Sequence, residues 1–282
     1  MKYVVKKHSS ITIYTARNSK RYRTGFFFAL PFLTGMCVFL IMPFFLLGCR
    51  SFFPDGGILE GLENYRNVYA SEAFQKAVFH TVILLTMSLC LALSVGVALA
   101  LFYQALGEKA GILMAAGLLP FLVPAMGAVM TVRIICPDSL FSLSLIHILK
   151  YGGFYGLLFV TGIYKIPLSY YEAAKVEGAG YWQQVRLVII PALKEMLKFV
   201  VILGSVHTFF GYREALLMGG THPPGKLYLM QHYLNNNFEQ MNETHLSVAA
   251  VTVVAGIFLL DRLVRLCSRG KSLWRKKKNM YI

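Results

Sequence analysis

The feature that most constrains this chain is a series of long apolar stretches separated by charged segments. Six such stretches cover residues 26–48, 79–103, 110–132, 140–164, 195–218 and 246 to about 266. A helix needs about 20 mainly apolar residues to cross a lipid bilayer, and the first three stretches have at least 23 residues each without a charge. The last three carry ionisable residues within or near the end of the stretch. The sequence therefore predicts an all-α fold, a polytopic membrane bundle of six transmembrane helices.

The composition supports a membrane protein and argues against soluble classes. Apolar residues make up 56% of the chain and charged residues 15%, against about 45–50% and about 25% in a typical soluble domain. The net charge of +15 would suggest nucleic acid in a soluble protein, but here the basic residues gather at the flanks of the apolar stretches. The five cysteines form no CxxC pair. We expect no nucleic-acid partner, no metal site and no structural disulfide.

The basic residues are distributed unequally between the two sides of the predicted membrane. The two tails and the second and fourth loops carry 21 Lys and Arg residues, whereas the other loops carry four. Basic loops stay on the cytoplasmic side, so both termini are predicted to be cytoplasmic. The predicted organisation is a basic tail (1–25), a first helix with an extracellular segment (26–75), a five-helix core (76–268) with a cytoplasmic loop at 165–195, and a second basic tail (269–282).

The long cytoplasmic loop carries the densest local pattern. Ser169 and Glu172 have the spacing of a capping box, and Gly178 can supply a left-handed end to the helix that follows. A second short helix is predicted from Tyr181 to about residue 189, ended by Pro191. Such a helical hairpin can insert into a groove on a soluble partner. No loop shows a catalytic nucleophile with a base, paired carboxylates or an HExxH motif, so no catalytic residue and no cofactor is predicted.

This loop resembles a known family motif. Glu172-Ala173-Ala174, then Gly178, then Val188-x-Ile190-Pro191 is similar to the EAA loop of permease subunits of binding-protein-dependent ABC importers. The segments 61–68, 150–154 and 217–220 resemble stretches of the carbohydrate and glycerol-phosphate branch of that family. The chain departs from the pattern at His80-Thr81, where Asn-Thr is usual, and in the short segment 133–139.

The resemblance implies the type I permease fold of ABC importers, in the plasma membrane, and a protein that is a transporter subunit without catalytic activity. It implies as partners the ABC ATPase subunits, a second, unlike permease subunit, the lipid bilayer and an extracellular solute-binding protein. The residues implied to couple transport to ATP hydrolysis are Glu172, Ala173, Ala174, Gly178 and Pro191. The solute implied is a sugar or oligosaccharide.

Three residues are candidates for the translocation path. Lys150 lies near the middle of a predicted span, and an ionisable residue there usually faces the bundle interior or a water-filled cavity. It is expected to contact solute or to pair with a carboxylate, such as Asp261 or one in the partner subunit. Arg213 is nearer the end of its span, where its side chain can also reach the membrane interface. Phe210 can stack on a sugar ring or simply pack against lipid.

Two other classes of function compete with the importer. An ion-coupled secondary carrier is expected to show inverted repeats and broken helices, and residues 1–140 and 141–282 show no internal repeat. Such a carrier also requires no ordered cytoplasmic hairpin. The other class is a non-transporting membrane scaffold or an integral membrane enzyme, and the cluster of catalytic residues that such an enzyme needs is not evident. Co-purification of a stoichiometric ATPase separates the importer from both.

Overall fold

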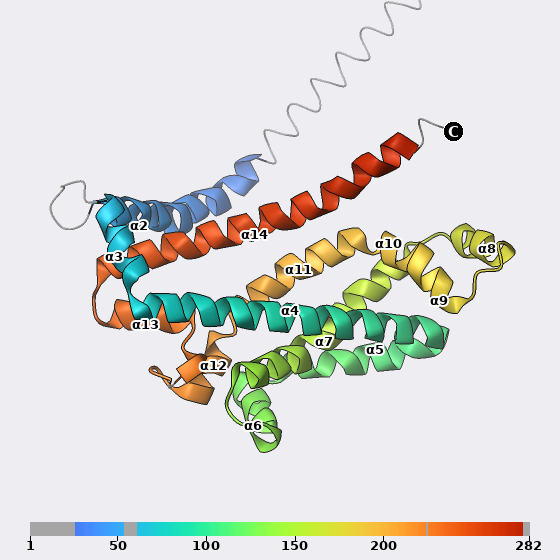
Figure 1. The fold of residues 1–282 in the computed structure, drawn as a ribbon, viewed down its shortest axis with the longest axis horizontal. Helices are drawn as coiled ribbons and strands as arrows, with labels where there is room; N and C mark the ends of the chain where they lie inside the picture. Colours follow the sequence, from blue (N-terminus) through green and yellow to red (C-terminus); the bar gives the residue numbers. More distant parts are fainter. Residues whose placement is uncertain (1–25, 54–60, 224, 279–282) are drawn as a thin grey trace, which may run out of the picture. The chain divides into compact units, whose positions relative to one another are not determined.

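The computed structural model describes residues 26–53, 61–223 and 225–278, and within these residues it contains helices and no strand (Figure 1). The first predicted tail, 1–25, lies outside the described residues. The elements are η1 (Cys37–Ile41), α2 (Met42–Phe52), α3 (Gly61–Ala70), α4 (Glu72–Leu106), η2 (Gly107–Lys109), α5 (Ala110–Leu118), η3 (Leu119–Leu122), α6 (Ala125–Ile135), α7 (Leu140–Tyr164), α8 (Leu168–Val176), α9 (Tyr181–Gln184), η4 (Val185–Ile189), α10 (Ile190–Ala192), α11 (Lys194–Phe209), α12 (Tyr212–Gly219), η5 (Gly225–Leu227), α13 (Met230–Glu239) and α14 (Glu243–Lys278).

The described residues fall into two compact units that divide between Asn64 and Tyr65. In the first unit, a helical segment of 27 residues runs over Phe26–Phe52 and includes the π-helical turn η1. None of the 18 residues in its most apolar window is buried against the described chain. The segment is therefore long and apolar enough to face lipid or another subunit along its length.

The second unit is organised around α4 and α7, which lie side by side (Figure 1). Small residues recur every four positions along the buried stripe of α4, at Ser88, Ala92, Gly96 and Ala100. Side chains of this size let two helix backbones approach closely, which is how membrane helices gain packing energy without a hydrophobic drive between them. The sequence of α4 thus specifies a close partner along one face.

Glycines on α7 complete these close contacts. A Cβ atom added at Gly156 would lie 2.9 Å from the Leu99 Cβ atom of α4. One added at Gly153 would lie 1.8 Å from the backbone oxygen of Gly117 in α5, which leaves no room for any side chain. These two glycines therefore permit close packing of α7 against α4 and α5.

The spans differ from six straight helices. Among the described residues, four helices are long and apolar enough to cross a membrane: Phe26–Phe52, Glu72–Leu106, Leu140–Tyr164 and Glu243–Leu266. A fifth span results if Ala110–Leu122 and Ala125–Ile135 are counted together, although they meet at 96°. Pro124 explains this bend, because proline has no N–H to donate and holds the preceding Val123 in an extended conformation with ψ 127.

The fifth predicted span, residues 195–218, is divided in two. Its residues form α11, with 16 residues, and α12, with eight, separated at Phe210 and Gly211. Neither helix alone is long enough to count as a span, so six transmembrane helices are not confirmed. The break brings the first turn of α12 back against α7, and this position matters for the site described next.

Candidate functional site: a buried polar layer and an exposed hairpin

A layer of polar side chains separates two apolar clusters inside the second unit. One cluster joins the C-terminal parts of α4 and α7 to η4 and α11. The other joins α6 and α12 to the first two turns of α7. Between them lie Ser88 of α4, Ser144, His147, Lys150, Tyr151 and Tyr155 of α7, His207 and Thr208 of α11, and Glu214 of α12, which we call the polar layer. Lys150 is the eleventh of the 25 residues of α7, so the polar layer lies deep in the bundle.

An ion pair forms the charged part of the polar layer. The Lys150 Nζ atom lies 2.6 Å from the Glu214 Oε1 atom, and the two side chains are only 12% and 11% exposed. Glu214 is in the first turn of α12, where the helix dipole favours a carboxylate. The Lys150 ammonium also lies 5.7 Å from the ring centre of Tyr151. Removing two charges from water is costly, and this geometry offsets that cost only while both partners are present.

A chain of hydrogen-bonding groups runs beside the ion pair. The Tyr155 hydroxyl lies 3.3 Å from the His147 Nε2 atom and 3.1 Å from the His207 Nδ1 atom. The His207 ring stacks on Tyr151 with a centre-to-centre distance of 4.3 Å. The Thr208 hydroxyl donates to the Gly204 carbonyl, 2.8 Å away, and lies 3.5 Å from the His147 Nδ1 atom. These groups hold α7 and α11 in register and offer donors and acceptors without a fixed charge.

The polar layer borders a small cavity. Its lining includes Ser88, His147, Lys150, Tyr151, His207, Thr208 and Glu214. The cavity encloses about 20 Å³, which is room for about one water molecule. A sugar therefore does not fit between these side chains in this conformation, and solute entry requires the helices to separate.

The three predicted path residues occupy different environments. Lys150 faces the bundle interior, as expected, and its partner is Glu214. The suggested pairing with Asp261 is wrong, because that carboxylate pairs with Arg265 one turn along α14, with 2.8 Å between the Arg265 Nε and Asp261 Oδ2 atoms. Phe210 is 73% exposed and borders an apolar groove between α4, α11 and α14, and Arg213 is exposed. The structure therefore brings only Lys150 to the polar layer.

Sequence reasoning missed most of the polar layer. Glu214 stands next to Arg213 in the sequence, and nothing in the local pattern tells which of the two turns inward. The break at Gly211 and the contact of α12 with α7 decide this, and both depend on residues far apart in the chain. The sequence did offer one signal. Glu214 lies next to the candidate Arg213 within the apolar stretch 195–218, and a carboxylate at such a position is a possible partner for Lys150.

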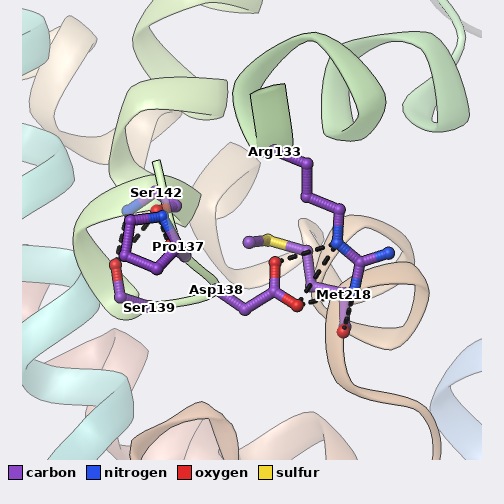
Figure 2. Close-up of polar contacts among 6 residues, drawn as sticks. All are labelled: Arg133, Pro137, Asp138, Ser139, Ser142 and Met218. Carbon is purple, nitrogen blue, oxygen red and sulfur yellow. Dashed lines mark hydrogen bonds and ion pairs between the residues drawn. The ribbon is translucent and has the colours of Figure 1, made fainter. Parts of the chain in front are cut away.

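A second polar cluster fixes the chain at the N-terminal end of α7 (Figure 2). The Arg133 guanidinium of α6 binds Asp138 with 2.6 Å between the Nη2 and Oδ2 atoms, and the Nη2 atom also donates to the Met218 carbonyl of α12 at 2.8 Å. The hydrogen bond from Arg133 lowers the pKa of the Asp138 carboxyl. Ser139 caps α7 by accepting from the Ser142 N–H at 3.2 Å. The ends of α6, α7 and α12 are thereby tied together.

The predicted coupling loop forms a helical hairpin at the other end of α7. In α8, Glu172 and Ala173 are exposed and Ala174 is half-buried. The helix ends at Val176, and Gly178, two residues further, has a φ of +76°, in the left-handed region. The Gly178 N–H donates to the Lys175 carbonyl and the Ala179 N–H to the Ala174 carbonyl, which is the Schellman pattern. The prediction of a left-handed helix end at Gly178 is confirmed.

Two details of the hairpin differ from the prediction. The capping box is wrong, because α8 begins at Leu168 after Pro167 and the N-terminal cap makes no side-chain hydrogen bond. Proline suits this position, since the first turn of a helix leaves its N–H groups unpaired in any case. Pro191 also does not end the second helix but lies inside α10, directly after the π-turn η4, whose wider turn changes the hydrogen-bond pattern before the proline.

The hairpin presents apolar side chains to the outside. Val176 of α8 is 89% exposed and Trp182 of α9 is 74% exposed, and Leu168 and Tyr170 are exposed as well. The inner side is anchored by Val185 and Ile189, which are buried in the apolar cluster shared with α4 and α7. An anchored hairpin with apolar outer residues is suited to contact another protein.

Comparison with known proteins identifies relatives over most of the chain. Residues 9–272 match the family described as binding-protein-dependent transport system inner membrane component. The trehalose/maltose transport system permease protein MalF of Thermococcus litoralis is 25% identical over 72% of this chain and 79% of its own length. The diacetylchitobiose uptake system permease protein NgcF of Streptomyces coelicolor is 25% identical over 80% of this chain and 78% of its own length.

A solved structure has a similar fold. It is a chain of a bacterial ABC transporter involved in the import of the acidic polysaccharide alginate, with a TM-score of 0.74. The alignment covers 90% of this chain and 97% of that chain at 18% sequence identity. At this identity the likeness shows the fold alone.

Proposed function

The chain belongs to the family of inner membrane components of binding-protein-dependent transport systems and is a permease subunit of an ABC importer, and we propose that its solute is a sugar or oligosaccharide. The observation that carries the choice of solute is the set of relatives named for disaccharide transport, which align with most of the chain. The polar layer supports it, because hydroxyl, imidazole and aromatic groups are those that recognise a polyhydroxylated ring.

The polar layer is the part of the translocation path that this chain contributes. Its cavity holds about one water molecule here, so the path opens when the helices around Lys150 and Glu214 move apart. Phe210 and Arg213 are exposed on this chain and can reach solute only on a face that a second permease subunit covers. That second subunit completes the path.

The hairpin α8–α10 is the contact with the ATPase. Glu172 and Ala173 lie on its exposed side, and the left-handed turn at Gly178 sets the direction in which α9 leaves α8. Because Val185 and Ile189 anchor the hairpin in the same apolar cluster as α4 and α7, movement of the hairpin reaches the helices of the path. Pro191 lies in α10, which follows the anchoring residues of η4. ATP hydrolysis takes place in the partner.

In the proposed orientation, both termini lie on the cytoplasmic side of the plasma membrane. The excess of Lys and Arg on one side of the spans supports this. Single cysteines at Lys175 and Arg66 test it by labelling with a membrane-impermeant thiol reagent in intact cells. Labelling is expected at position 66 and not at position 175, and labelling at position 175 from outside would reverse the assignment.

Reconstitution tests the function as a whole. The permease pair, ATPase and solute-binding protein are placed in proteoliposomes, and uptake of maltose, trehalose and diacetylchitobiose is measured with and without ATP. We expect ATP-dependent uptake of a saccharide that requires the binding protein. Uptake driven by an ion gradient without the ATPase would support a secondary carrier, and failure to transport any saccharide would contradict the proposed solute class.

A further inference from the structure

The charge balance of the polar layer bears on which saccharides can pass. Among the described residues that line the cavity, only Lys150 and Glu214 carry a permanent charge, and they are paired with each other. The other polar residues of the lining, Ser88, His147, Tyr151, His207 and Thr208, offer hydrogen bonds without a fixed charge. The site therefore presents no net charge to a solute.

This neutrality depends on Glu214 being present. Lys150 alone would place an uncompensated ammonium group beside the cavity, at a depth where little water is available to screen it. Such a group would attract a carboxylate on a solute and would compete with neutral hydroxyls for the same position. Glu214 occupies that position at 2.6 Å and so acts as an internal substitute for an anionic solute.

Other basic groups near this part of the chain do not replace it. The Arg133 guanidinium is bound by Asp138 and by the Met218 carbonyl. Lys76, near the start of α4, pairs with Glu72 one turn earlier, with 2.5 Å between the charged atoms. Both cations are engaged by acidic groups of the same chain. Arg213, next to Glu214 in the sequence, is exposed and is not among the residues that line the cavity, so it adds no charge there.

We propose that Glu214 is a specificity-determining residue: by neutralising Lys150 it makes this permease select uncharged saccharides and reject acidic ones. The inference rests on the proposed function as a saccharide importer. The fold does not dictate this selectivity, because a chain of the same fold belongs to a transporter of an acidic polysaccharide. In this proposal, the charge at position 214 of the polar layer determines the selectivity.

Binding to the full transporter tests the proposal. The permease pair with its ATPase is placed in nanodiscs, and the solute-binding protein is omitted so that its own selectivity does not contribute. Maltotetraose and tetragalacturonate serve as probes of equal length that differ in their carboxylates. Binding of both is measured with the ATPase nucleotide-free and trapped in its ATP-bound state, for the natural protein and for Glu214→Gln.

The natural protein is expected to bind maltotetraose in preference to tetragalacturonate. Glu214→Gln is expected to shift the ratio of the two affinities by about tenfold or more toward tetragalacturonate, because it leaves Lys150 unpaired. The double variant Lys150→Met/Glu214→Gln removes both charges and is expected to keep the natural ratio. A ratio that is the same in all three proteins would mean that the pair is only structural and would overturn the proposal.

Two further outcomes are separated by design. Should Glu214→Gln not assemble, His207→Lys adds a cation to the same cavity with the pair intact, and the same shift toward tetragalacturonate is expected. No shift there would overturn the proposal equally. If the natural protein binds neither probe and the reconstituted importer transports no saccharide, both the proposed function and the proposed selectivity are contradicted. Normal saccharide transport with an unchanged ratio contradicts the selectivity alone.

Discussion

The polar layer and the α8–α10 hairpin are the two candidate functional regions of this chain, yet they are held in different ways. The polar layer is buried and depends on side chains from four helices that meet across the bundle, as Lys150 and Glu214 show. The outer side of the hairpin is exposed and depends on local backbone geometry, such as the φ of +76° at Gly178. Charge changes should therefore damage stability in the first region and communication with a partner in the second.

The largest effect on stability is expected from breaking the buried ion pair. Lys150→Met keeps the length and apolar character of the side chain but leaves the Glu214 carboxylate without its partner. We expect a loss of about 3–5 kcal/mol in the free energy of unfolding, because a lone buried charge retains its desolvation cost. Thermal unfolding of the purified subunit complex measures it.

The matched control is Lys150→Met/Glu214→Gln. Removing both charges should restore most of the lost stability, because no buried charge is then left alone. Equal stability of the single and double variants would show that the two side chains do not act as a pair, and the contrast between the two regions would lose its main support.

A buried histidine outside the candidate spans should give the next largest effect. His232 in α13 is fully buried, and burial lowers its pKa to about 4 from the usual value near 6.5. The unfolded chain therefore takes up a proton first as the pH falls. The stability due to neutral His232 is complete above about pH 6.5 and is lost progressively toward pH 4, by about 3 kcal/mol in all.

The pH dependence of the unfolding temperature between pH 7 and pH 4 measures this effect. His232→Gln has no imidazole to protonate and should show a shallower loss over the same range. A curve as steep as that of the natural protein would assign the acid sensitivity to other groups.

In the hairpin the expected effect on stability is smaller and comes from the backbone. Gly178→Val places a β-branched side chain at a φ of +76°, which costs roughly 1–2 kcal/mol. The turn would relax to another conformation and α9 would leave α8 in a different direction, so ATP-dependent uptake should fall by more than stability does. Gly178→Asn is the control, because asparagine tolerates this region, and it should retain most of the uptake.

The smallest effect on stability is expected at Glu172, which is exposed. Glu172→Lys should change the free energy of unfolding by no more than about 0.5 kcal/mol, as surface substitutions usually do. It should nevertheless abolish ATP-dependent uptake, and the ATPase should either dissociate or no longer respond to the binding protein. Glu177→Lys makes the same charge change at an exposed residue outside the motif and should retain uptake. Equal losses of uptake in both variants would remove the special role of Glu172.

The sequence by itself determined the class of fold and the place of the hairpin. Uncharged stretches of more than 20 residues can be stable only as membrane-spanning helices or in a very large core, so length and apolar content sufficed for α4. The turn at Gly178 was predictable because glycine alone adopts positive φ without steric cost, and this property is local.

Only the tertiary structure decided the division of the last-but-one predicted span and the partner of Lys150, whereas the bend of the third predicted span has a local cause in Pro124. The break at Gly211 interrupts a stretch whose apolar content favours a continuous helix, and packing against neighbouring helices selects the interrupted form. Glu214 and Lys150 are 64 positions apart in the sequence, whereas Asp261 pairs with Arg265, one turn away in the same helix. Which carboxylate a buried ammonium meets is set by the packing of α12 on α7, a long-range contact that no local pattern encodes.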